Sequence, residues 1–261
     1  MSLQKWLWAA LAFGVAAGVA SADPMRTVFT KENKFPGALG TELSLSGGGS
    51  SYDPEIFGVD EITTYSVGPG VRFGVTDRLA LRAEFPYVGY SSGDLDESGM
   101  GDVELGTDFL FYEDIFEYGW IIPHATAILA TGDEDKGLGT GEGQGRLGVS
   151  AGTTVNDVIH CAVDTSYTIN GTESDDWLDD DREDLLTFAL SGIWDLDDRS
   201  SLIGEVQFRD DPVDEEDDFA FRGHLGMAYR INDYLSLMGY GGGASGLDED
   251  YYGMGRLVCQ F

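Results

Sequence analysis

Polar and apolar side chains alternate with a period of two through residues 62–90. Apolar residues such as Val71, Phe73 and Leu81 fall on one face, while glycine, arginine and glutamate fall on the other. Successive side chains of a β-strand point to opposite sides, so this spacing predicts strands with one apolar and one polar face. The polar pair Thr76-Asp77 separates the two runs and predicts a tight hairpin turn.

The same alternation recurs along the chain and predicts twelve strands. They cover residues 37–46, 62–75, 78–90, 101–112, 119–131, 145–155, 158–170, 185–194, 200–209, 218–231, 234–243 and 250–261. Connections after even-numbered strands are short, and those after odd-numbered strands are longer and acidic, with eight carboxylates in residues 173–184 and seven in residues 210–218. An even number of strands with short turns at one end and long loops at the other is typical of a bacterial outer-membrane β-barrel. The short turns are then periplasmic.

Aromatic residues on the apolar face form two bands, which favours a barrel in lipid over a soluble β-sandwich. One band lies near the short turns and one near the long loops, with aliphatic residues between them: Phe73, Phe109, Phe111, Trp194, Tyr229 and Phe261 in the first, and Tyr65, Phe85, Tyr87, Tyr167, Phe208, Phe219, Phe221 and Tyr251 in the second. Aromatic side chains concentrate at both membrane interfaces. A sandwich core gives no reason for such segregation.

The polar face carries the residues that we expect to line the lumen, including all three histidines. They are Arg72, Arg82, Glu84, Asp102, Glu104, His124, Arg146, His160, Asp164, Glu205, Arg209, Arg222, His224 and Arg256. If this face met lipid, each arginine at mid-membrane depth would cost about 2–4 kcal/mol. The sum exceeds the usual stability of a domain, about 5–15 kcal/mol, so these residues are expected to point inward.

Twelve strands lie between two known regimes of barrel size. About eight strands leave an interior that side chains just fill, and about sixteen leave an open aqueous channel. Many inward positions are glycine, which leaves space beside the large charged groups. A narrow pore with a mixed-charge lining is therefore expected, and the alternative is a barrel kept shut by arginine–carboxylate pairs.

Composition and the N-terminal sequence indicate where in the cell the protein is located. Residues 1–22 have one lysine, an apolar run and a small-residue site, which together predict a secretory signal peptide. Residues 23–36 have no clear period and predict a periplasmic leader, whose sequence leaves open whether it plugs the lumen. The barrel then covers residues 37–261. The net charge of −32 argues against a nucleic-acid partner, and Cys161 and Cys259 fall on strands too far apart to form a disulfide.

The sequence lacks a recognisable catalytic or metal motif. The three histidines lie on strands that are not immediate neighbours, and no paired-cysteine or paired-histidine spacing is present. A hydrolase with a serine, a histidine and an acid in the wall is the weaker alternative. Acidic runs such as residues 133–135 and 179–181 offer oxygen ligands for calcium without a complete binding loop. We expect no cofactor and no enzymatic activity.

Three segments resemble the MetA-pathway of phenol degradation family of outer-membrane proteins. They are GPGVRFGVTDRLALRAEFP, MGDVELGTDFLF and the run that begins PHATAILATGDEDKGLGTGEGQG. The most specific part is a strand ending in Thr131-Gly132, followed by Gly139-Thr140-Gly141 and a strand–turn–strand unit. This family often has proline before the Thr-Gly pair, where this chain has Ala130. The resemblance implies transport of small aromatic or hydrophobic compounds.

These observations predict a passive outer-membrane channel for small solutes, with acidic loops that favour cations at its mouth. The alternative is a closed barrel with a structural or surface-binding role, in which acidic loops bind divalent cations. Outer-membrane lipid is the expected surrounding. The final strand, which ends at Phe261, resembles the terminal signal that such barrels present to the barrel-assembly machinery.

Overall fold

The computed structural model describes residues 24–53, 61–93, 95–115, 118–170, 184–210, 219–245 and 250–261. It contains fifteen strands and one short 3-10 helix. The strands are β1 Thr41–Tyr52, β2 Ile62–Thr76, β3 Leu79–Glu84, β4 Tyr87–Ser92, β5 Leu95–Met100, β6 Val103–Phe109, β7 Tyr112–Ile115, β8 Gly119–Leu129, β9 Gln144–Val155, β10 Ile159–Ile169, β11 Leu185–Asp195, β12 Ser200–Asp210, β13 Phe219–Asn232, β14 Leu235–Ser245 and β15 Tyr251–Gln260, and the helix η1 is Glu134–Lys136. The expected signal peptide and most of the two most acidic loops lie outside the described residues.

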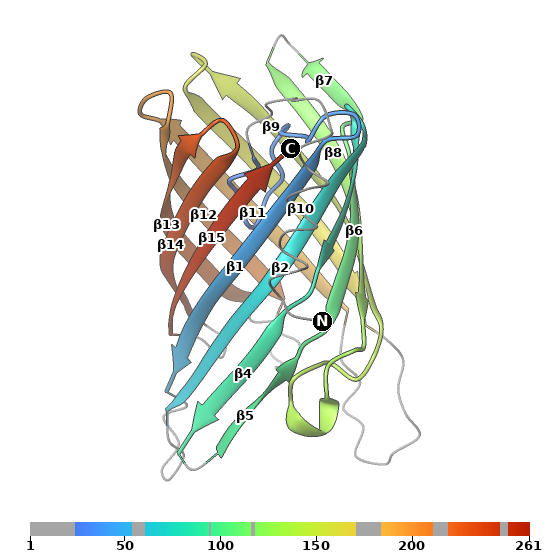
Figure 1. Cartoon of the computed structure of the whole chain (residues 1–261), viewed down its shortest axis with the longest axis vertical. Coiled ribbons are helices and arrows are strands. Elements are labelled where there is room, and N and C mark those ends of the chain that lie inside the picture. Colours follow the sequence, from blue (N-terminus) through green and yellow to red (C-terminus); the bar gives the residue numbers. More distant parts are fainter. Residues whose placement is uncertain are drawn as a thin grey trace.

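The strands close into a twelve-position antiparallel barrel (Figure 1). Strand β1 pairs with both β15 and β2, so the ladder has no seam at the chain ends. Strands β3 and β4 share one wall position, and β5, β6 and β7 share the next, which reduces fifteen strands to twelve positions. The twelve strands predicted from alternation are therefore confirmed, including their up-and-down order.

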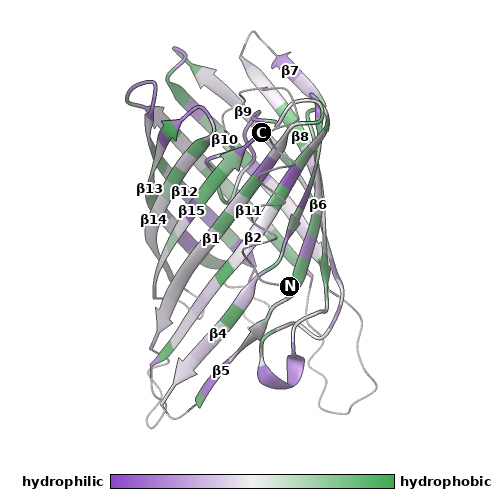
Figure 2. Cartoon of the chain, in the orientation of Figure 1, coloured by the Kyte–Doolittle hydropathy of each residue, from purple (hydrophilic) through white to green (hydrophobic). Residues whose placement is uncertain are grey.

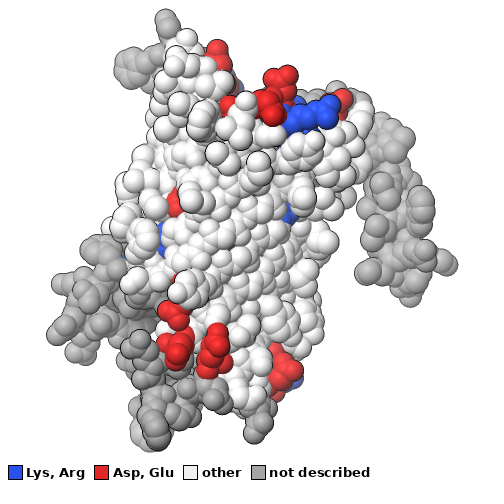
Figure 3. All heavy atoms as spheres, turned by 90° about the vertical axis from the view of Figure 1, so that its left-hand side faces the viewer, with Lys and Arg blue, Asp and Glu red and all other residues white. Residues whose placement is uncertain are grey.

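The exterior is apolar and the charged side chains are enclosed. Hydrophobic and hydrophilic positions alternate along the strands (Figure 2). On the face shown in Figure 3, charged atoms gather at the two ends, and the waist between them is nearly free of charge. Outward side chains such as Leu81, Leu105, Leu147 and Val163 are exposed, whereas Arg72 and Asp108 are buried. This is the arrangement of a barrel whose outer surface meets lipid.

The short connections lie together at one end of the barrel, at the top of Figure 1, and the longer ones at the other. In the β9–β10 turn, Asn156 and Asp157 both have positive φ, 51° and 58°. Two consecutive residues of this kind form the turn whose twist matches a β-hairpin, and Asn and Asp tolerate it better than most residues. The C-terminus closes at the same end, because Thr41 and Phe261 exchange two backbone hydrogen bonds of 3.0 and 2.9 Å.

Two of the expected strands are interrupted in the structure. The third, residues 78–90, breaks at Phe85-Pro86 between β3 and β4, and the fourth, residues 101–112, breaks at Leu110-Phe111 between β6 and β7. The structure also extends the fourth position backward by β5, which lies in the expected loop and is separated from β6 at Gly101-Asp102. Pro86 has no N–H for the ladder, but its carbonyl accepts from the Gly101 N–H at 2.9 Å. This hydrogen bond keeps the two neighbouring wall positions paired across the break. Pro69 and Pro123, in contrast, lie within β2 and β8.

None of the described segments forms a helix long and apolar enough to span a membrane. Cys161 lies on β10 and Cys259 on β15, and both thiols are free.

Candidate functional site

The segment before β1 lies inside the barrel. Residues 37–40 connect it to β1 at the short-turn end, and the segment itself packs against inward-facing side chains (Figure 1). Met25, Arg26, Thr27, Glu32 and Phe35 are all buried there. We call residues 24–36 the plug. The sequence left its position open, because the segment has no period that assigns it to a face.

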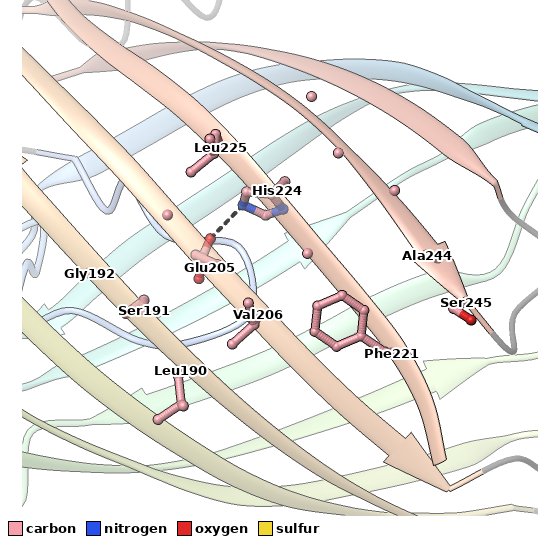
Figure 4. Close-up of a pocket in the computed structure, with 15 residues that line it drawn as sticks. Leu190, Ser191, Gly192, Glu205, Val206, Phe221, His224, Leu225, Ala244 and Ser245 are labelled. Carbon is pink, nitrogen blue, oxygen red and sulfur yellow. Dashed lines mark hydrogen bonds and ion pairs between the residues drawn. The ribbon is translucent and has the colours of Figure 1, made fainter. Parts of the chain in front are cut away.

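The tip of the plug is held by one carboxylate, that of Glu205 on β12. Its two oxygens accept hydrogen bonds from the backbone N–H groups of Val28 at 2.6 Å, Phe29 at 3.0 Å and Thr30 at 3.3 Å. The ring of His224 on β13 bonds the same carboxylate through Nε2 at 3.0 Å (Figure 4). Glu205 is 2% exposed. Buried backbone donors need partners, and a charged acceptor gives stronger hydrogen bonds than a neutral one.

Further contacts fix the plug to four other parts of the wall. The Thr30 hydroxyl bonds that of Ser191 at 2.7 Å, and the Lys31 N–H donates to Ser150 Oγ at 3.0 Å. Arg72 donates to the Lys34 carbonyl at 2.6 Å. Arg26 bonds Glu32 within the plug and Asp195 and Ser201 on the wall. The plug is therefore attached by hydrogen bonds and ion pairs to β2, β9, β11 and β12.

Apolar side chains fill the lumen around the plug at the short-turn end. Phe35 of the plug packs in one cluster, with Ala80, Leu110, Trp120, Ile122 and Ala162, and the other cluster consists of Ile193, Ile203, Ala228, Met238, Tyr240 and Val258. Alternation puts Trp120 and Ile122 on the same face as His124, but the period alone does not separate the apolar half of this face from the charged half. The inner face is therefore polar only in part.

Charged residues from four strands meet beside the plug. Asp108 on β6 lies 3.5 Å from Arg72 Nε and 3.7 Å from Arg82 Nε. Arg72 also lies 3.6 Å from Glu42, and Arg82 lies 3.8 Å from Glu104. Large inward side chains need space, and glycine provides it here: a Cβ on Gly106 would lie 2.5 Å from Arg82 Nε. The cluster joins β1, β2, β3 and β6 from the inside.

Between the plug and the long-loop end lies a chamber of about 490 Å³. Thr27, Val28, Phe29 and Lys31 of the plug border it. Ten of the fourteen residues expected in the lumen line it: Arg72, Arg82, Glu84, Glu104, His124, Arg146, Asp164, Arg209, Arg222 and Arg256. The lumen is thus a chamber on one side of the plug and a packed core around it.

The other four expected residues have different places. Glu205 and His224 hold the plug, as described above. His160 lies near the short turns, where its Nε2 is 2.8 Å from Asp195. Asp102 bonds the backbone of the loop between β8 and β9, at the long-loop end.

The histidines are held apart, each by its own carboxylate. His124 lies 2.8 Å from Asp164, His160 lies 2.8 Å from Asp195, and His224 lies 3.0 Å from Glu205. Ser150 also bonds Asp164, so the carboxylate stands between serine and histidine. In a hydrolase triad the histidine takes the middle place, where it removes the serine proton. The arrangement here does not activate Ser150. In the described ranges, no three metal-ligating side chains come together to hold an ion.

Asp102 explains the motif of the family resemblance. Its carboxylate accepts from the N–H groups of Thr131 at 3.0 Å, Gly132 at 2.9 Å and Thr140 at 2.7 Å, and from the Thr140 hydroxyl at 2.8 Å. The Thr-Gly pair and the Gly-Thr-Gly loop are therefore donors to one acceptor. Among the described strands β5 pairs only with β4, and Leu138 of the same loop packs against Gly99 of β5. The loop covers an edge that would otherwise lack a neighbour.

Asp102→Asn is expected to loosen this loop. An amide keeps only one acceptor oxygen, so about half of the four hydrogen bonds are lost, at roughly 0.5–1.5 kcal/mol for each bond of this half-buried group. Trypsin should then cleave after Lys136, in η1, on the order of tenfold faster in the folded protein. Asp96→Asn on β5 makes the same change of charge at an exposed residue and is the control. Equal cleavage rates in the two variants would contradict this role of Asp102.

The outer wall is hollowed where β11 to β14 pass outside Glu205 and His224, the pair that holds the plug tip. The hollow measures about 740 Å³, and Figure 4 shows Leu190, Val206, Phe221 and Leu225 around it, with the Glu205–His224 pair spanning β12 and β13. Its floor includes Gly192, Gly204, Gly223, Gly241 and Gly243. The hollow is apolar and faces outward, so it belongs to the exterior.

Comparisons with known proteins agree on the fold. No family model matches the chain, and no curated protein matches it in sequence. Among solved structures, the COG4313 outer membrane channel from Pseudomonas putida F1 matches with a TM-score of 0.68 at 16% identity, covering 92% of this chain and 99% of that chain. The KdgM porin matches with a TM-score of 0.54 at 9% identity, covering 84% and 99%. The translocator domain of autotransporter NalP from Neisseria meningitidis matches with a TM-score of 0.51 at 12% identity, covering 99% and 94%. The chain is thus similar in fold to outer-membrane β-barrels.

Proposed function

We propose that the chain is a bacterial outer-membrane channel that passes small solutes through its lumen. The observation that carries this proposal is that the lumen is closed by a segment held by hydrogen bonds. A closed wall with an apolar exterior encloses a charged chamber of about 490 Å³, and the tip of the segment beneath it is held by hydrogen bonds to Glu205. Such contacts can break and re-form, whereas a wall of paired strands cannot open without unfolding.

The family resemblance and the solved structures support the same proposal. The matched Pseudomonas putida protein is described as an outer membrane channel, and it is covered almost entirely, at 99% of its length. The Asp102-centred loop gives the resemblance to the MetA-pathway of phenol degradation family a structural basis. We therefore propose membership of that group, residence in outer-membrane lipid and assembly by the barrel-assembly machinery through β15.

Reconstitution in planar bilayers tests the channel. The protein is expected to give discrete but infrequent conductance steps, because the plug fills the short-turn half most of the time. Protein denatured before reconstitution is the control, and it should give no steps of fixed size. A silent full-length protein together with a silent plug-loosened variant would refute the proposal.

One finding favours a second candidate, a closed barrel with a structural role. Two apolar clusters surround the plug and leave the short-turn half packed. A closed barrel predicts that loosening the plug lowers stability without producing any ion current. The bilayer measurement therefore separates the two functions, and calcium titration of the intact protein tests cation binding by the acidic loops.

A further inference from the structure

The chamber has the opposite charge balance to the rest of the chain. The chain contains 15 Lys and Arg against 47 Asp and Glu. Seven of those basic residues, the six arginines named above and Lys31, border the chamber, against four acidic ones, Glu42, Glu84, Glu104 and Asp164. The difference, seven minus four, is three positive charges in a protein with a net charge of −32. Almost half of the basic residues therefore serve a single cavity.

The basic residues near the plug are already compensated by carboxylates. Arg72 lies near Glu42 and Asp108, and Arg82 near Glu104 and Asp108. Toward the long loops the compensation is weaker. Arg146 donates its Nε to the neutral Thr168 hydroxyl at 3.1 Å. The buried Nε of Arg256 has no hydrogen-bond partner in the described protein. Among the described residues, Arg146 and Arg256 thus border the chamber without an ion pair to a carboxylate.

These guanidinium groups reach the chamber from separate parts of the wall. Arg146 belongs to β9, Arg222 to β13 and Arg256 to β15, and all three border the same space. Arg222 lies over the Tyr252 ring at 4.2 Å and over the Phe29 ring of the plug at 5.8 Å. Stacking of this kind holds a guanidinium in a fixed orientation. An anion in the chamber would therefore meet donors from several sides.

We propose that this chamber is a binding site for small organic carboxylates, and that it makes the channel prefer anions. A guanidinium presents paired N–H donors that match the two oxygens of a carboxylate. A volume of about 490 Å³ falls within the range of small-molecule sites, about 300–1,000 Å³. Phe29 and Met254 also line the space and offer apolar contact to the body of such a solute. The inference rests on the proposed function and names its substrate class.

The acidic loops at the mouth have the opposite preference, so salt separates the two effects. Exposed charges are screened over about 3 Å at 1 M salt and over about 10 Å at 0.1 M. At high salt we expect the chamber to set the selectivity of the full-length channel. A potassium chloride gradient should then give a reversal potential that indicates chloride preference.

The arginines are tested as a pair, with two matched variants. Arg146→Gln combined with Arg256→Gln should abolish the chloride preference, whereas the double lysine variant keeps the charge and should retain it. Arg199→Gln, in the exposed β11–β12 turn, should leave selectivity unchanged. All recordings use the full chain, and the Glu205→Gln background lengthens the openings.

Benzoate and its neutral analogue benzyl alcohol probe carboxylate recognition. Benzoate should block the chloride current and benzyl alcohol should not. The block should weaken on the order of tenfold in the double glutamine variant, as expected for the loss of charge-assisted hydrogen bonds. Equilibrium dialysis of benzoate against the detergent-solubilised protein measures the site without any current.

Failure of the inference and failure of the channel proposal have different signatures. A potassium preference at high salt, equal block by the two probes, or an unchanged double glutamine variant overturns the carboxylate site while conduction stands. Absence of current from every variant refutes the channel, and benzoate binding in dialysis then decides the site by itself.

Discussion

Glu205→Gln is expected to raise the time-averaged conductance of the barrel on the order of 30-fold. The Glu205 carboxylate accepts three backbone N–H groups of the plug tip and a ring nitrogen of His224. Glutamine keeps the size of the side chain but has one acceptor oxygen and adds two donors. A loss of about 2 kcal/mol in plug binding corresponds to about 30-fold in the equilibrium between the plugged and unplugged states. Planar-bilayer recording measures this ratio directly.

A matched control distinguishes plug release from a simple change of charge. Glu84→Gln removes one carboxylate from the chamber wall, at a residue for which the structure gives no hydrogen bond to the plug. Its conductance should stay within about twofold of the unaltered protein, since no hydrogen bond of the plug is changed. Trypsin gives a second readout, because an undocked plug exposes the bonds after Lys31 and Lys34. If the two glutamine variants conduct alike, Glu205 does not hold the plug.

The wall of the barrel was predictable from sequence because one face of every strand meets lipid. Val71, Phe73 and Leu81 alternate with Arg72 and glycine without ambiguity. Proline alone does not locate the break at Pro86, because Pro69 and Pro123 also lack the ladder N–H and yet lie within β2 and β8.

The interior was predictable only in part, because a period of two reports faces and not depth. Trp120 and His124 share the inward face of β8, yet Trp120 packs in an apolar core and His124 lines the chamber. The plug is held by hydrogen bonds from its backbone to side chains such as Ser150 and Glu205, which leave no periodic trace in residues 24–36. One signal was present: large apolar residues on the inward face gather toward the short turns, where a buried core would require them.

Asp108→Asn is expected to lower the free energy of unfolding by about 3–5 kcal/mol. The Asp108 side chain is 1% exposed and lies 3.5 Å from Arg72 Nε and 3.7 Å from Arg82 Nε. These separations exceed normal hydrogen-bond lengths, so the interaction is chiefly Coulombic and acts in a poorly solvated interior. Lys31 of the plug adds a third positive charge that interacts with the same carboxylate. Neutralising Asp108 leaves these cations in mutual repulsion, and Glu42 and Glu104 compensate only one arginine each.

Urea unfolding in detergent micelles, followed by tryptophan fluorescence, measures this loss, because Trp120 lies in the adjacent core. Asp157→Asn is the matched control. It makes the same chemical change in an exposed turn at a φ of 58°, a conformation that asparagine tolerates, and should alter stability by less than about 0.5 kcal/mol. Equal midpoints for the two variants would show that Asp108 does not hold the arginines together. A large loss confined to Asp108→Asn instead means that the plug and the wall share one buried charge cluster, and that displacing Lys31 from it is part of the free energy of opening.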